Sequence, residues 1–159
     1  MPYQAVILTV SDSCAAGTRT DTSGPAIRAM LENAGFAVQA MQTVPDEEGQ
    51  ISAAIVHACD ILQADLVVTT GGTGLSPRDV TPEATLSVLD REIRAIPVAM
   101  WVEGLKSTPR AMLSRAVAGI RGHTLVLNVP GSEKAARENL GAVVATLDHA
   151  LRMLAGGGH

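Results

Sequence analysis

The chain has 159 residues, of which 47% are hydrophobic and 18% are charged, and its formal net charge is −4. This length and composition predict one folded domain and argue against a disordered chain. Because the chain has one tryptophan, one tyrosine, one phenylalanine and no basic cluster, it lacks the stacking platforms and basic face that nucleic-acid binding needs.

Location and assembly also follow from composition. No apolar run approaches the roughly 20 residues of a membrane span, and no positive charge precedes the first apolar run, as a secretory signal requires. We therefore expect a cytoplasmic protein without a membrane partner. Cys14 and Cys59 are too far apart to form a metal-binding pair, so we expect two reduced thiols. The charged fraction is below the usual roughly 25%, which favours a homo-oligomer that buries part of the surface.

Apolar runs that resemble strands alternate with helical patterns, which predicts an α/β fold with a largely parallel sheet. The expected strands are 5–10, 36–44, 65–70 and 124–129. The expected helices are 25–33, 46–62, 81–89 with Thr81 as N-cap, 97–105, 109–117 and a last one after residue 132. We expect a single domain at 1–155 and a flexible tail at 156–159.

Three of the expected strands end in polar or glycine-rich loops. These loops are Ser11-Asp12-Ser13, Gly71-Gly72-Thr73-Gly74 and Pro130-Gly131-Ser132. Ligands of open α/β sheets bind outside the carboxyl ends of the strands. The three loops therefore line one cleft if their strands are neighbours. Ser11, Asp12 and Ser13 equally suit a local turn with no ligand.

The glycine-rich loop that ends in Asp79 is the most informative motif of the chain. Glycine lets the backbone approach a ligand closely, and turned N–H groups form an anion-binding concavity. The loop matches neither a P-loop nor a dinucleotide fingerprint. Asp79 could hold a cation beside the anion, and a phosphate ester with Mg²⁺ fits both halves. The alternative is a purely structural turn.

Two other positions keep two interpretations each. Asp46 begins an expected helix, where an acid is favourable as a cap, but together with Asp79 it could bind Mg²⁺. Ser114 and Arg115 lie near Arg110 in an expected helical patch. That patch is either a solvated helix face or a place where arginine reaches an anionic substrate.

These residues, in this order, resemble the MoaB/Mog family of molybdenum cofactor biosynthesis proteins over nearly the whole chain. The matching segments are 9–13, 21–24, 44–46, 69–83, 113–116 and 127–132. The resemblance implies a three-layer α/β/α domain of the molybdopterin-binding type with a mostly parallel central sheet. It also implies assembly into trimers or hexamers.

The resemblance further implies a molybdopterin adenylyltransferase. ATP and molybdopterin would bind in one cleft, the terminal phosphate of molybdopterin would attack the α-phosphorus of ATP, and pyrophosphate would leave. Asp46 and Asp79 match the essential acids of the family and would be the catalytic residues that hold Mg²⁺. The residues expected to contact substrate or nucleotide are Ser11, Asp12, Ser13, Gly71, Gly72, Thr73, Gly74, Ser114, Arg115, Pro130, Gly131 and Ser132. A downstream molybdate-insertion protein is an expected partner.

One position departs from the family pattern. Many relatives have a second proline after the late Pro-Gly turn, whereas this chain has Glu133. Its negative charge would stand at the mouth of an anion site, although an acid is favourable at a helix N-terminus. The alternatives to the enzyme are a non-catalytic molybdopterin-binding or scaffold protein and a domain acting on another pterin or nucleotide. The retained Asp46 and Asp79 favour the enzyme.

Overall fold

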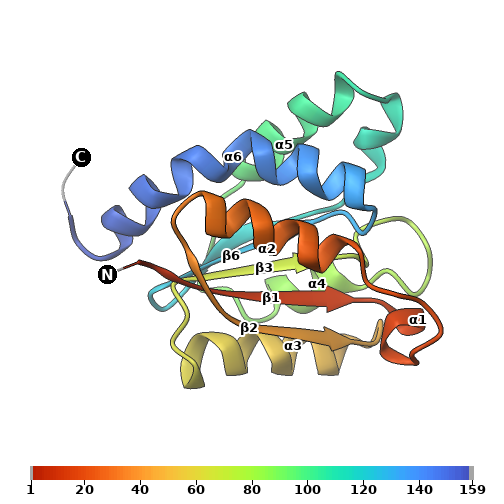
Figure 1. The fold of residues 1–159 in the computed structure, drawn as a ribbon, viewed down its shortest axis with the longest axis horizontal. Coiled ribbons are helices and arrows are strands. Elements are labelled where there is room, and N and C mark those ends of the chain that lie inside the picture. The colour runs from red at the N-terminus through yellow and green to blue at the C-terminus, as the bar shows by residue number, and fades with distance from the viewer. Residues whose placement is uncertain (1, 158–159) are drawn as a thin grey trace.

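A single mixed sheet forms the centre of the computed structural model, which describes residues 2–157 (Figure 1). Its strand order is β2-β1-β3-β6-β5-β4. The bounds are β1 Gln4–Val10, β2 Ala37–Val44, β3 Leu66–Thr70, β4 Arg91–Glu92, β5 Ala118–Arg121 and β6 Thr124–Val129. The first four strands of that order pair in parallel, whereas β5 pairs antiparallel with both β6 and β4.

Helices cover both faces of the sheet, which confirms the three-layer α/β/α fold (Figure 1). One face carries α2 Ser23–Asn33, α5 Ala95–Leu105 and α6 Glu133–Leu154, and the other carries α3 Glu48–Val56 and α4 Thr81–Leu86. The remaining elements are a short helix α1 Asp12–Ala15, a π-helix His57–Ile61 and a 3₁₀ helix Pro109–Leu113.

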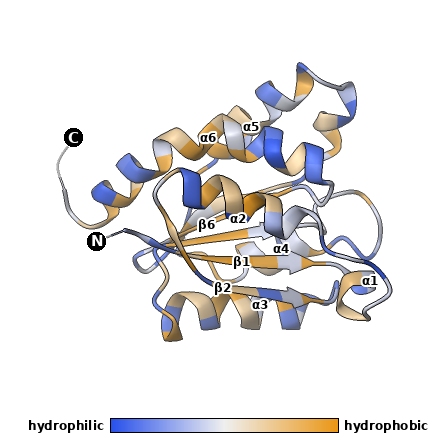
Figure 2. Cartoon of the chain, viewed as in Figure 1, coloured by the Kyte–Doolittle hydropathy of each residue, from blue (hydrophilic) through white to orange (hydrophobic). Residues whose placement is uncertain are grey.

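The core divides into two clusters because successive side chains of a strand point to opposite faces. In β1, Ile7 packs with the α2 and α6 layer, and Leu8 packs with the α3 layer. Since both faces are covered, the central strands are continuous apolar runs. Figure 2 shows this core and the more polar residues at the carboxyl ends of β1 and β3. Those ends carry Thr9, Thr69 and Thr70, all buried.

The expected helix 109–117 is the main error in secondary structure. Only Pro109–Leu113 is helical, as a 3₁₀ turn, and the chain then forms strand β5. Strands β4 and β5 were missed because they have two and four residues, too short for a clear pattern. The expected helices 46–62 and 81–89 are also shorter or irregular, since α3 passes into the π-helix and α4 ends at Leu86.

Two residues of the expected flexible tail, Gly156 and Gly157, form the end of helix α6. Gly156, at φ +86°, donates its N–H to the carbonyl of Met153 (3.0 Å), and Gly157 donates to Arg152 (2.9 Å). This pattern is a Schellman motif that closes α6. Residues 158 and 159 of the expected tail lie outside the described residues. Within 2–157, no helix combines the length and hydrophobicity needed to cross a membrane.

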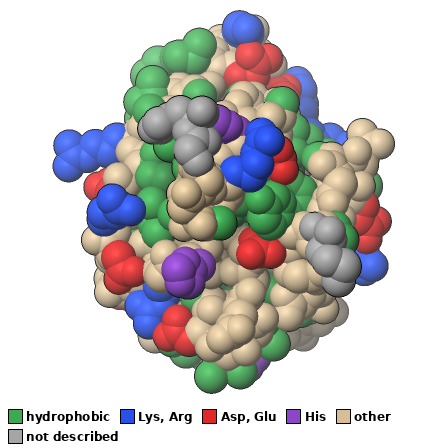
Figure 3. All heavy atoms as spheres, turned by 90° about the vertical axis from the view of Figure 1, so that its left-hand side faces the viewer, with side chains coloured by type: hydrophobic (Ala, Val, Ile, Leu, Met, Phe, Trp, Pro, Cys, Tyr) green, Lys and Arg blue, Asp and Glu red, His purple; other side chains and the backbone are tan. Residues whose placement is uncertain are grey.

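The order of the connections places a crevice between β1 and β3. Helix α2 links β1 to β2 on one face of the sheet, whereas α3 links β2 to β3 on the other. Such a switch point is where open α/β sheets bind ligands, at the carboxyl ends of the strands. The opposite end of the molecule carries the start of β1 and the end of α6, and its surface mixes acidic, basic and apolar side chains (Figures 1 and 3).

Candidate functional site

A pocket of about 760 Å³ opens at the carboxyl ends of β1, β3 and β6. All three loops expected to converge contribute to its wall. Of the expected site residues, the wall includes Ser11, Asp46, Gly71, Gly72, Thr73, Gly74, Asp79, Ser114, Pro130, Gly131 and Ser132. Asp12, Ser13 and Arg115 are not part of that wall. The three loops at the carboxyl ends of the strands thus line one pocket, as the sequence predicted.

The glycine loop has an unequal distribution of hydrogen bonds. The carbonyls of Gly71 and Gly72 accept hydrogen bonds from Thr81, one from its hydroxyl and one from its N–H. The carbonyls of Thr73 and Gly74 accept from Arg115. By contrast, of the N–H groups of residues 71–74, only that of Gly71 has an acceptor within the described chain, the Val129 carbonyl at 3.1 Å. The N–H groups of residues 72–74 are therefore free to bind an anion.

Two glycines of this loop are required by its own backbone. Gly71 and Gly72 have φ values of +100° and +68°, which other residues rarely adopt. A Cβ on Gly72 would also collide with the Thr81 hydroxyl. Thr81 is therefore the first helical residue of α4 and an anchor of the loop, not the N-cap that the sequence suggested. Backbone angles and hydrogen bonds within the protein therefore stabilise this conformation of the loop.

The guanidinium of Arg115 makes several contacts within the protein, and the expected contact of Arg115 with substrate stays a prediction. Its Nε donates to the Gly74 carbonyl (2.8 Å) and its Nη2 to the Asp79 carbonyl (2.7 Å). Its Nη1 forms an ion pair with Glu83 (2.7 Å). This pair lowers the pKa of Glu83 and raises that of Arg115. Because these bonds occupy the guanidinium, Arg115 fixes both ends of the loop and does not line the pocket.

Asp46 is not the helix cap that one interpretation predicted. The N-cap position of α3 is Glu47, and the Asp46 carboxylate instead accepts the N–H of Asp12 through Oδ2 (2.9 Å). The Asp12 carboxylate accepts the N–H of Asp46 in return (2.9 Å) and pairs with Arg78 (2.9 Å). Asp12 therefore contacts protein groups and lies outside the pocket wall, and its contact with a ligand stays a prediction.

The two candidate catalytic carboxylates line the same pocket and have similar bonding. Asp79 Oδ2 accepts the N–H of Ser76 (3.0 Å), as Asp46 Oδ2 accepts an N–H from the other side. Within the described chain, Oδ1 of Asp46 accepts no hydrogen bond, and neither does Oδ1 of Asp79. Each acid thus keeps one oxygen for a ligand. Burial raises the pKa of Asp46, and the charges of Asp12 and Asp79 raise it further.

This donor set fits a magnesium ion bound together with substrate. No group of three or more His, Cys, Asp or Glu residues within 2–157 could hold a metal alone. Mg²⁺ is commonly bound by one or two carboxylates plus substrate phosphates and water. The free oxygens of Asp46 and Asp79 supply the carboxylates, and the adjacent free amides of the glycine loop can bind the phosphates.

Three serines of the pocket wall also accept hydrogen bonds from nearby backbone N–H groups. Ser11 Oγ accepts the N–H of Cys14 (3.2 Å) and contacts the Ser13 hydroxyl, so a local turn forms beside the pocket. Ser132 Oγ caps α6 through the N–H of Ala135 (3.3 Å). Ser114 Oγ accepts the N–H of Ala116 (3.3 Å). The turn that the sequence allowed at Ser11 therefore forms, and Ser11 also lines the pocket, while a hydrogen bond from Ser11 to a ligand stays a prediction.

Sequence reasoning missed several pocket residues. Asp21 accepts the Thr9 hydroxyl (2.7 Å) and the Gly24 N–H (3.0 Å), and so connects β1 to the start of α2 beside the pocket. Arg19 and Arg110 line the pocket, and no side-chain ion pair joins either to another residue of 2–157. The Asp-Thr-Ser-Gly helix start was a usable signal for Asp21. Arg110 belonged to the arginine patch that the sequence indicated, whereas Arg19, in an irregular loop, gave no signal.

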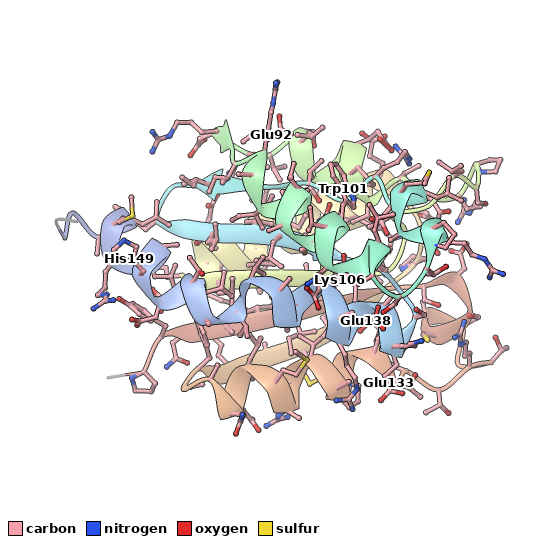
Figure 4. All side chains as sticks on the ribbon, turned by 90° about the horizontal axis from the view of Figure 1, so that it is seen from above. Glu92, Trp101, Lys106, Glu133, Glu138 and His149 are labelled. Carbon is pink, nitrogen blue, oxygen red and sulfur yellow. The ribbon has the colours of Figure 1, made fainter. Side chains whose placement is uncertain are left out.

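The charge at Glu133 is balanced locally. Glu133 pairs with Arg137 one turn later (3.0 Å) and does not line the pocket. Figure 4 shows Glu133 and Glu138 near the same end of α6, and of the two only Glu138 contributes to the pocket wall. The negative charge at Glu133 therefore lies outside the pocket wall and is paired with Arg137.

Comparison with known proteins identifies the family and the fold of the chain. The family described as "Probable molybdopterin binding domain" matches residues 6–149. A solved structure of the molybdopterin biosynthesis enzyme MoaB from Thermus thermophilus is 49% identical, covers 97% of both chains and superposes with a TM-score of 0.92. The fold and the family resemblance inferred from the sequence are both confirmed.

Among curated proteins, the chain is 42% identical to gephyrin of Dictyostelium discoideum over 93% of its own length but only 22% of gephyrin. It is 38% identical to the molybdopterin adenylyltransferase of Helicobacter pylori strain J99, covering 94% of this chain and 86% of that protein. The chain spans between 22% and 50% of the length of gephyrin and two other long relatives.

Proposed function

Since the chain belongs to the molybdopterin-binding domain family of molybdenum cofactor biosynthesis, we propose that it is a molybdopterin adenylyltransferase. It transfers AMP from ATP to the terminal phosphate of molybdopterin and releases pyrophosphate. Relatives named molybdopterin adenylyltransferase, which match over most of both chains at 38% to 41% identity, support the proposal.

The observation that carries this proposal is the glycine loop beside two carboxylates. Every carbonyl from Gly71 to Gly74 accepts a hydrogen bond from the protein, whereas three consecutive N–H groups are left for a ligand. Asp46 and Asp79 each present a free oxygen to the same pocket. A polyphosphate chelating a divalent cation is the ligand that uses both features.

The reaction needs positioning and charge neutralisation more than a protein nucleophile. An oxygen of the terminal molybdopterin phosphate forms the new bond to the α-phosphorus of ATP. The bond from the α-phosphorus to the bridging oxygen breaks, and pyrophosphate leaves with the electron pair. The N–H groups of residues 72–74 bind phosphate oxygens, and Arg19 and Arg110 provide positive charge on the pocket wall.

Asp46 and Asp79 would hold the Mg²⁺ ion. When bound, the ion supplies neutralisation of the charge that develops on the leaving pyrophosphate. The N–H of Asp12 fixes one oxygen of the Asp46 carboxylate, and the N–H of Ser76 fixes one oxygen of the Asp79 carboxylate. Ser11 and Ser132 are placed on the pocket wall where they can orient polar edges of adenosine or pterin.

The test is molybdopterin-dependent release of pyrophosphate from Mg²⁺-ATP, with Asp79→Asn as the variant. Asparagine retains an oxygen that can accept the Ser76 N–H, so the fold persists, but loss of the charge should lower turnover roughly 100-fold. Asp148→Asn is the matched control because Asp148 pairs, among the described residues, with Arg152 alone on the surface of α6. Equal activity in wild type and Asp79→Asn would refute the assigned role. Molybdopterin binding without release would favour the non-catalytic binding protein.

We also propose that the chain works as a cytoplasmic homo-oligomer, a trimer or hexamer. Helix α5 exposes Val98, Val102 and Leu105 by 48%, 57% and 45%. Trp101 lies on the same helix (Figure 4), and its buried Nε1 has no hydrogen-bond partner within the described chain. Burying this apolar stripe against a second copy would be favourable. Light scattering of wild type and Val102→Glu tests this, since the charged variant should shift toward monomer.

A further inference from the structure

Three loops around the pocket are joined by one set of hydrogen bonds. Arg78, in the loop after β3, binds the Asp12 carboxylate through both Nε (3.0 Å) and Nη2 (2.9 Å). The same carboxylate accepts the N–H of Asp46 (2.9 Å), and the N–H of Asp12 donates to the Asp46 carboxylate (2.9 Å). Asp12 thus connects the loop after β3 with the loop after β2.

The stability of the fold does not explain this arrangement. The side chains of Arg78 and Asp12 are 58% and 46% exposed, and ion pairs this exposed contribute little to folding. The geometry is nevertheless specific, because two parallel hydrogen bonds fix the orientation of a carboxylate as a single contact cannot. That orientation is also the one in which Asp12 accepts the Asp46 N–H.

We propose that Arg78 and Asp12 are positioning residues that fix the Asp46 carboxylate relative to Asp79 for binding a divalent cation with nucleotide. The inference rests on the proposed function for the identity of this ligand. Arg78 directly precedes Asp79, whose carboxylate is bound by the N–H of Ser76. The ion pair therefore holds the segment that carries Asp79 against the loop that carries Asp46.

The chain of contacts explains how a residue outside the pocket can influence it. Neither Asp12 nor Arg78 lines the pocket, whereas both Asp46 and Asp79 do. Without Arg78, the Asp12 carboxylate loses the two donors that orient it, and the Asp46 N–H loses a fixed acceptor. The free Oδ1 of Asp46 would then sample more directions, at a cost in metal affinity rather than in folding. Groups that orient metal ligands typically alter metal affinity by about tenfold or more when removed.

The first experiment measures, in protein without ligand, whether the Arg78–Asp12 ion pair fixes the backbone at Asp46. Amide hydrogen exchange by NMR in Arg78→Gln should be faster by about tenfold at the Asp46 N–H, because its charged acceptor is no longer fixed. Arg28→Gln is the matched control, since it removes an arginine from an exposed ion pair with Glu32. Unchanged exchange at Asp46 in Arg78→Gln would overturn the inference, whatever the protein does with nucleotide.

The second experiment measures Mn²⁺ affinity, as a spectroscopic substitute for Mg²⁺, in the presence of α,β-methylene-ATP. Arg78→Gln and Asp12→Asn should each weaken Mn²⁺ binding about tenfold. The double variant should bind Mn²⁺ no more weakly than either single variant, because both substitutions break the same Arg78–Asp12 ion pair. Arg78→Lys, which keeps the charge without the fork, should recover only part of the affinity. Additive losses, or losses matched by Arg28→Gln, would contradict the positioning role.

The two experiments separate this inference from the proposed function. Wild type that binds no Mn²⁺ with the nucleotide and forms no product would refute the proposed adenylyltransferase function. Hydrogen exchange at the Asp46 N–H would still show whether Arg78 and Asp12 position Asp46. Active wild type with unchanged exchange and affinity in Arg78→Gln would refute the positioning role alone. A lower melting temperature with unchanged Mn²⁺ affinity would show a merely structural ion pair.

Discussion

Replacing Arg115 with methionine should destabilise the protein and weaken binding of ATP. Methionine keeps the length of the side chain but removes the donors to the carbonyls of Gly74 and Asp79. A hydrogen bond from a charged group contributes about 1.5 kcal/mol or more, so the two bonds together contribute about 3 kcal/mol. The ion pair with Glu83 adds under about 1 kcal/mol because both side chains are more than a third exposed.

This loss corresponds to a melting temperature lower by about 6–12 °C for a domain of this length. Thermal unfolding followed by circular dichroism measures it, and isothermal titration with ATP measures the effect on the loop. Arg28→Met is the control, since Arg28 makes an ion pair on the exposed face of α2. Wild-type melting temperature and wild-type ATP affinity in Arg115→Met would refute the role of Arg115 in holding the loop.

Three further predictions follow from the site and the core. Burial raises the pKa of Asp46 above its ordinary 3.8, so native protein keeps a proton there that unfolded chain has lost; the contribution of Asp46 to stability should therefore fall as pH rises through this window, and denaturant titrations should show the stability of wild type falling relative to that of Asp46→Asn. Gly72→Ala should destabilise the loop by about 1–3 kcal/mol because of its positive φ, whereas Gly49→Ala, in open space within α3, should be neutral or stabilising in the same titrations. Burial raises the pKa of the Cys59 thiol to about 11, so a disulfide reagent should modify only Cys14 in native protein and both thiols after unfolding.

The central part of the fold was predictable because its signals are local. β1, β3 and β6 are continuous apolar runs, which is the pattern of strands covered on both faces. The antiparallel edge was not predictable in the same way. β5 is stabilised by pairing with β6 across the Gly122 turn, and its own four residues include a glycine and an arginine. Tertiary pairing decided its conformation.

The candidate site likewise contains residues that local sequence reveals and residues whose roles depend on distant partners. The glycine loop and its following aspartate could be recognised because neighbouring residues carry the pattern. The role of Arg115 could not, since its carbonyl partners at Gly74 and Asp79 lie 41 and 36 positions away. Asp12 was expected to contact a ligand because it follows a strand, and its pairing with Arg78, 66 positions away, depends on the folded chain.

The central claim is that AMP becomes attached to molybdopterin in the pocket formed by the glycine loop, Asp46 and Asp79. The most direct measurement is mass spectrometry of the products formed from molybdopterin and Mg²⁺-ATP. The account predicts adenylylated molybdopterin and an equal amount of pyrophosphate with wild type, and little of either with Asp79→Asn. Unmodified molybdopterin recovered from folded wild type that binds both substrates would contradict it.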